Sequence, residues 1–162
     1  SVSVAPPMFV DVVNVTSAAD MADVVKSKAA EQDIIIMTAA VADFCPSHPA
    51  DEKIKKNDSS YESVIELERT EDILSYLGAH KAKGQLICGF SMETQNMLEN
   101  SKAKLAKKNA DMIVANNLKV AGAGFGTDTN VVTLITADDC TELEIMDKSC
   151  VASRIMDRLL QM

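Results

Sequence analysis

The sequence predicts an α/β fold: a three-layer, Rossmann-like domain with a mainly parallel sheet and a C-terminal antiparallel hairpin. Short apolar segments alternate with segments of helical periodicity, a pattern typical of parallel sheets whose strands are joined by helices. Residues 34–37 read IIIM, and such a continuous apolar run favours a central strand covered on both faces. Residues 131–136 and 142–146 resemble the two strands of a hairpin. We expect one domain over residues 1–162, because this length suffices for one hydrophobic core.

The elements are expected in a regular order along the chain. Strands are predicted at 9–15, 33–40, 61–68, 85–91 and 111–115, with long loops at 41–60 and 116–130. The first helix is predicted to begin at a Thr16 or Ser17 cap and to end near Gln32. Further helices are predicted at 72–80, at 94–109 with Thr94 as its cap, and at 149–162.

Composition excludes several classes of protein. The formal net charge of −8 argues against nucleic-acid binding, which needs a basic face. No apolar stretch reaches the roughly 18–20 residues of a membrane span. The four cysteines have the spacing of neither a zinc site nor a redox pair. We therefore expect free thiols, with Cys88 buried in a strand, and a reducing, cytoplasmic location.

The predicted sheet indicates where a ligand binds. In open α/β sheets the ligand lies beyond the carboxyl ends of the strands. This rule selects four segments, at residues 38–56, 68–72, 90–94 and 116–130. The glycines at 122–126 lack the strand-and-helix context of a phosphate loop, so we interpret them as a flexible turn.

The first segment begins with Met37, Thr38 and Ala39 and continues to Asp43. Small residues at a strand end let a flat ligand approach the backbone, although the same alanines could equally pack against a helix. The Asp43 carboxylate could bind a ribose hydroxyl, a base amino group or a metal-bridged phosphate, or it could cap the loop.

Lysines occur in two groups. Residues 52–56 read EKIKK, and Lys104 and Lys108 are four apart on one helical face. Either group could neutralise a polyphosphate, or could be solvated surface charge. Bare backbone, one carboxylate and several lysines together suit a nucleoside triphosphate better than other common ligands.

Read in order, several motifs carry a family resemblance that covers the whole chain. They are AAVADF at 39–44, EKIKK at 52–56, RTEDIL at 69–74, GFSMET at 89–94, KLAKKNAD at 104–111, and the segments 114–117 and 124–130. The ordered set resembles the phosphopantothenoylcysteine synthetase half of the bacterial bifunctional coenzyme A flavoproteins.

The resemblance implies a ligase that joins 4'-phosphopantothenate to cysteine. It implies CTP with Mg²⁺, an acyl-cytidylate intermediate and a homodimer. It also implies a decarboxylase domain in the parent protein, so we expect no FMN in this chain. From the composition we expect neither nucleic acid nor a membrane as a partner.

The resemblance also assigns roles to residues. Lys53 becomes the catalytic lysine, which also contacts the triphosphate, and no protein side chain is assigned as a metal ligand. The nucleotide-binding positions carried over are Met37, Thr38, Ala39, Asp43, Lys53, Glu71, Asp72, Ile73, Leu74, Phe90, Lys104 and Lys108.

One departure from the family pattern matters. The family's glycine-rich opening segment and asparagine-containing loop have no counterpart here, so we expect the first strand and helix of the domain upstream of Ser1. The chain is then the C-terminal part of the synthetase domain, with a sheet edge that favours self-association. The alternative is a truncated nucleotide-binding domain without turnover. A Rossmann dehydrogenase is disfavoured because the dinucleotide fingerprint is missing.

Overall fold

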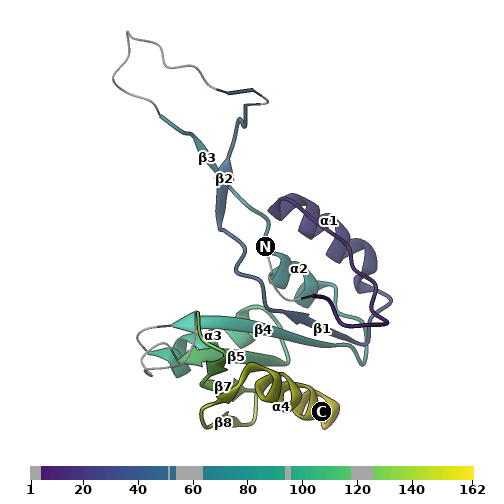
Figure 1. Ribbon diagram of the computed structural model, residues 1–162, viewed down its shortest axis with the longest axis vertical. Coiled ribbons are helices and arrows are strands. Elements are labelled where there is room, and N and C mark those ends of the chain that lie inside the picture. The colour runs from purple at the N-terminus through teal and green to yellow at the C-terminus, as the bar shows by residue number, and fades with distance from the viewer. Residues whose placement is uncertain (1–4, 51, 54–63, 94–95, 118–125) are drawn as a thin grey trace.

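The computed structural model describes residues 5–50, 52–53, 64–93, 96–117 and 126–162. Its main sheet has the strand order β1-β4-β5-β7-β8 (Figure 1). The strands β1 (Ile34–Met37), β4 (Leu86–Glu93) and β5 (Met112–Asn117) run parallel. The strands β7 (Val132–Ile135) and β8 (Cys140–Glu142) continue the sheet as an antiparallel hairpin. The predicted fold class is confirmed.

Helices cover both faces of this sheet. On one face lie α1 (Ala18–Ala29), α2 (Ile73–Ala79) and α3 (Met97–Lys107), and on the other lies α4 (Lys148–Leu160). The side chain of Ser101 on α3 hydrogen-bonds Ser91 at 2.8 Å, and both are buried. Since side chains alternate along a strand, Ser91 shares its face with Ile87, which packs under α1 and α2.

Neighbouring residues of β4 pack into two different hydrophobic cores. Ile87 packs with Ala22, Ile73 and Leu77 beneath α1 and α2. Cys88 points to the opposite face, into the core beneath α4. There α4 contributes residues four apart, as an amphipathic helix must; these are Val151, Ile155 and Leu159. A strand buried on both faces explains the continuous apolar run of β4.

Both ends of α1 are fixed by side chains. Ser17 is the N-cap, and its hydroxyl accepts a hydrogen bond from the Asp20 backbone N–H at 3.0 Å. The Asp20 carboxylate accepts from the Ser17 N–H at 2.9 Å, which completes a capping box. Hydrogen bonds from Thr16 and Ser17 lower the pKa of Asp20 to about 2. At the other end, Gln85 Nε2 donates to the carbonyls of Ala29 and Gln32 at 2.7 and 2.6 Å.

Two predictions about strands are wrong. Residues 9–15 form no strand, and Phe9 is fully exposed with a φ of 66°. The apolar pattern was present, but the segment has no neighbouring strand among the described residues with which to pair. The strand β1 was predicted to be central, yet it lies at the edge of the sheet, pairs with β4 on one side and is only half-buried.

A two-stranded arm leaves the body of the domain between β1 and α2. The strands β2 (Phe44–Pro46) and β3 (Leu67–Arg69) pair antiparallel, and the arm points away from the sheet (Figure 1). The prediction of a strand at 61–68 is therefore correct only near its end, and residues 61–63 lie outside the described part. The strand β2 was missed inside the predicted loop 41–60, because three residues carry no periodicity.

The C-terminal hairpin differs in one detail from the prediction. Residues 142–146 were expected to pair with 131–136, but the hairpin partner of β7 is β8 at 140–142, so the strand pairing is confirmed only at Glu142. Met146 belongs instead to β9 (Met146–Asp147), which pairs with β6 (Thr129–Asn130). The helix α3 begins after Asn96 rather than at Thr94, which lies outside the described residues.

All four cysteines are free thiols, as expected. Burial, with a contribution from the Asp111 charge, raises the pKa of the Cys88 thiol to about 12. The thiol is therefore unreactive, and the side chain contributes to core packing. Within the described ranges, no helix is long and apolar enough to cross a membrane.

Candidate functional site

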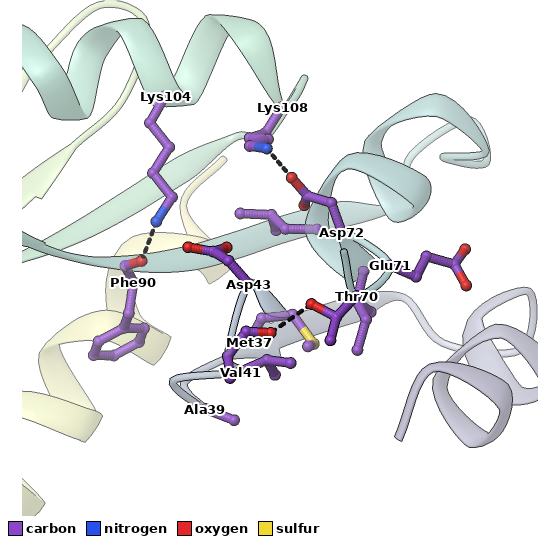
Figure 2. A pocket seen from close by; sticks show the side chains of 13 residues that line it. Met37, Ala39, Val41, Asp43, Thr70, Glu71, Asp72, Phe90, Lys104 and Lys108 are labelled. Atoms are coloured by element: carbon purple, nitrogen blue, oxygen red, sulfur yellow. Dashed lines mark hydrogen bonds and ion pairs between the residues drawn. The ribbon is translucent and has the colours of Figure 1, made fainter. Parts of the chain in front are cut away.

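A pocket of about 260 Å³ lies at the carboxyl edge of the parallel strands (Figure 2). The strand β1 ends at Met37, which is in register with Gly89 of β4, so the two strands form the floor at the same level. The segment after β1, the start of α2 and the inner side of α3 form the walls. The lining residues are Met37, Ala39, Val41, Ala42, Asp43, Thr70, Glu71, Asp72, Ile73, Leu74, Phe90, Lys104 and Lys108.

The helix α3 places two lysines over this floor. Lys104 Nζ donates to the Phe90 carbonyl at 2.8 Å, and Lys108 Nζ donates to Ser75 Oγ at 2.9 Å and to the Asp72 carboxylate. A spacing of four residues puts both ammonium groups on one helical face. Their partners hold each group at the pocket wall rather than in solvent.

Asp72 joins the start of α2 to this lysine pair. It is the N-cap of α2, and its carboxylate accepts from the Ser75 backbone N–H at 2.9 Å. Burial alone would raise the pKa of Asp72. The hydrogen bonds and charge of Lys108 and the Ser75 N–H outweigh burial, so the pKa lies below its usual value. The Asp72 carboxylate is therefore ionised at neutral pH.

The other two acids of the pocket differ from Asp72 and from each other. Glu71 forms an ion pair with Lys26 of α1, outside the pocket lining. Hydrogen bonding to Glu71 raises the pKa of Lys26. The Asp43 carboxylate, by contrast, is exposed and makes no hydrogen bond or ion pair with the described residues. Asp43 is therefore the acid of the pocket that is open to an incoming cation or donor.

Two glycines allow the pocket walls to approach each other. A Cβ on Gly78 would lie 1.8 Å from the Lys108 carbonyl oxygen, so only glycine lets α2 pack against the end of α3. A Cβ on Gly89 would lie 2.6 Å from Leu74, which rests on β4. These contacts let α2 lie close to the end of α3 and to β4.

The pocket gathers ten of the twelve residues predicted for the nucleotide site. Thr38 instead lines an adjoining cavity between the N-terminal segment, α1 and β1. Lys53 is exposed, follows the arm strand β2 and is not part of the lining. Its contact with the nucleotide stays a prediction.

Sequence reasoning missed three lining residues, which are Val41, Ala42 and Thr70. The Thr70 hydroxyl donates to the Ala42 carbonyl, and the Thr70 N–H donates to the Asp43 carbonyl at 3.0 Å. These bonds close the base of the arm against the pocket. Their position in the sequence could have identified them, since all three lie in the segments 38–56 and 68–72 that follow predicted strands.

The family resemblance implies Mg²⁺, so we asked which side chains of the pocket could ligate it. Across the part of the chain that the structure describes, no group of three or more His, Cys, Asp or Glu side chains could hold a metal. Mg²⁺ commonly uses one or two carboxylates and takes its other ligands from substrate phosphates and water. The unpaired Asp43 fits that requirement, so the residues present suit a metal that arrives with a polyphosphate.

The fold and the pocket define a layered α/β domain with a pocket where the parallel strands end, the place where such sheets commonly bind ligands. The chain belongs to the family described as the DNA/pantothenate metabolism flavoprotein C-terminal domain, whose family model matches residues 1–162.

Similar proteins agree with this assignment. The coenzyme A biosynthesis bifunctional protein CoaBC of Bacillus subtilis is 46% identical over 155 residues, which are 95% of this chain and 37% of that protein. The chain thus spans less than half of that relative. The crystal structure of a CoaBC C-terminal domain superposes with a TM-score of 0.79 at 40% identity, covering 99% of this chain and 72% of the other. A Cab2 variant in complex with phosphopantothenate-cysteine shares the fold, with a TM-score of 0.63 at 18% identity over 91% of this chain and 52% of the other.

Proposed function

We propose that this chain is the nucleotide-binding part of a phosphopantothenate–cysteine ligase of coenzyme A biosynthesis. The observation that carries the proposal is the pocket, which joins the predicted backbone floor, Asp43, Lys104 and Lys108 in one place. The CoaBC relatives, and the ligand named for the Cab2 variant, support the same substrate class.

The proposed reaction has two steps. The carboxylate of 4'-phosphopantothenate attacks the α-phosphorus of CTP, which forms an acyl-cytidylate and releases pyrophosphate. The cysteine amine then attacks the acyl carbon, the amide bond forms, CMP leaves and the amine loses a proton. Mg²⁺ entering with CTP would offset charge on the phosphate oxygens, and we propose Asp43, which was not assigned as a metal ligand from the sequence, as the carboxylate that would bind it.

The chain's own residues would bind and orient the nucleotide. Lys104 and Lys108 would exchange part of their present partners for phosphate oxygens, and the backbone at 37–39 would contact the cytosine. Charge-assisted hydrogen bonds of this kind are stronger than neutral ones. Phe90, on the pocket floor, would pack against the nucleotide.

Lys53 would support the chemical steps by stabilising charge that develops on the reacting oxygens. It lies on the arm rather than in the pocket, so this role requires the arm to approach the nucleotide, from the same chain or from a second copy. We infer a homodimer in which the arms participate, because Phe44, Ile65 and Leu67 expose apolar side chains there. We place the protein in the cytoplasm and assign FMN to a decarboxylase domain outside this chain.

The test is pyrophosphate release by the complete protein supplied with CTP, Mg²⁺, phosphopantothenate and cysteine. We expect pyrophosphate only when phosphopantothenate is present, and we expect CTP to serve better than ATP. CTP binding in calorimetry without any pyrophosphate release would instead favour the alternative, a nucleotide-binding domain without turnover. Absence of both binding and release would exclude the ligase.

A further inference from the structure

The charge balance of the pocket poses a problem for an anionic ligand. Its lining carries two lysines, Lys104 and Lys108, but three acids, Asp43, Glu71 and Asp72. Asp72 is paired with Lys108 within the pocket, and Asp43 is the acid available to a cation. Glu71 thus adds a negative charge that neither lysine of the pocket neutralises, close to where phosphates are proposed to bind.

Lys26 supplies the missing positive charge from outside the lining. It lies on α1, and its ammonium group pairs with the Glu71 carboxylate, 45 residues further along the chain. In Figure 2 the Glu71 side chain points away from Asp43 and Lys104. The acid is held at the outer side of the pocket wall.

The surroundings of Lys26 keep it in this position. Its Nζ lies 5.0 Å from the centroid of the Tyr76 ring, within the range of a cation–π contact. The Tyr76 ring in turn stacks on His80 at 4.0 Å between centroids. The side chain of Lys26 is 26% exposed, so the pair is partly shielded from solvent. Both partners of Lys26, Glu71 and Tyr76, flank the start of α2.

We propose that Lys26 is a positioning residue that holds the Glu71 carboxylate out of the pocket and neutralises it, so that a polyphosphate can bind between Lys104 and Lys108. This inference rests on the proposed function, because it assumes a polyphosphate ligand. It assigns to α1 an electrostatic role in that site besides its packing on the sheet. Although Glu71 is among the predicted nucleotide-binding positions, its carboxylate would repel the phosphates if Lys26 did not hold it away from them.

The alternative is that the pair merely fastens α1 to α2, and a set of variants of the complete protein separates the two roles. We expect Lys26→Met to weaken CTP binding about tenfold at low salt, the order expected for one partly screened unit charge. Glu71→Gln alone should tighten binding, and the double variant should bind nearly as well as the unmodified protein. Lys28→Met, which removes an exposed lysine from the same helix, is the matched control.

If the Lys26–Glu71 ion pair only connects α1 to α2, the variants should show the opposite pattern. Glu71→Gln would then weaken binding as Lys26→Met does, and the double variant would show no rescue, which would overturn the role of Lys26. Repeating the titrations with inorganic tripolyphosphate isolates the charge effect from recognition of the base. An unmodified protein that binds neither CTP nor tripolyphosphate overturns the proposed function itself, whereas CTP binding without rescue overturns only this inference.

Discussion

The pocket and the arm present the same residue type in opposite settings. Lys108 is 13% exposed and bonded to Asp72 and Ser75, and Lys104 is bonded to the Phe90 carbonyl. Lys53 is exposed in the segment between β2 and β3, the two strands of an arm that points away from the sheet. The fold thus holds the two pocket lysines in place through bonds within the protein, whereas the role proposed for Lys53 would require the arm to approach the pocket.

The largest effect is expected at Lys53. If the arm reaches the nucleotide during the chemical steps, Lys53→Gln should lower kcat by about 100–1,000-fold, as loss of a charge-stabilising donor does. Its exposure means that Tm should not change. Steady-state pyrophosphate release measures kcat, and the exposed Lys83→Gln serves as control. An unchanged kcat would remove the arm from catalysis.

The pocket lysines should behave differently, since they act through binding. Lys108→Met should raise the KM for CTP roughly 10–100-fold, because a hydrogen bond to a charged group contributes about 1.5–3 kcal/mol. Lys107→Met, on the exposed side of α3, should leave the KM near that of the unmodified protein. Equal KM values for the two variants would mean that the preformed pocket does not bind the nucleotide.

The pocket's geometry depends on a close approach of two helices. Gly78→Ala would place a methyl group 1.8 Å from the Lys108 carbonyl oxygen. Overpacking of this kind costs about 1–3 kcal/mol, reduced here by the better helix propensity of alanine. Urea unfolding measures the free energy lost. Gly84→Ala is a useful contrast, because its Cβ meets nothing within 4 Å and only its φ of 84° opposes the change. A cost at Gly78 no larger than at Gly84 would contradict the packing account.

The smallest effect concerns the start of α1, which carries Lys26. The pKa of Asp20 is lowered to about 2 by its hydrogen bonds to Thr16 and Ser17. A depressed folded-state pKa stabilises the protein above the unfolded value, and this contribution is lost as pH falls through about 2. The Tm difference between the unmodified protein and Asp20→Asn should therefore be present at about pH 5 and shrink toward about pH 2. A difference that is constant with pH would show that the charge of Asp20 is not involved.

Elements with a long periodic pattern could be predicted from the sequence. The helices, and the apolar strands β4, β5 and β7, follow from residue spacing and continuous apolar runs. The failures concern relations between strands. Residues 9–15 have the composition of a strand but no partner strand in the part of the chain that the structure describes, and β1 has the composition of a central strand yet lies at an edge. Which strands pair depends on the strands that lie beside them in the sheet, and the composition of one segment does not encode this.

The candidate site shows the same division. Lys104 and Lys108 could be placed together from their spacing, and Asp43 from its position after a strand. The ion pair of Lys26 with Glu71, and the bond from Thr70 to Ala42, join residues 45 and 28 positions apart, and no local pattern marks them. They arise only when α1, α2 and the base of the arm meet in three dimensions.

A crystal structure of the protein with CTP and Mg²⁺ tests the central claim most directly. We expect a triphosphate within hydrogen-bond distance of both Lys104 and Lys108, with the metal at Asp43 and the Glu71 carboxylate still turned toward Lys26. CTP bound at any other surface, with Lys108 still paired only with Asp72 and Ser75, would contradict it.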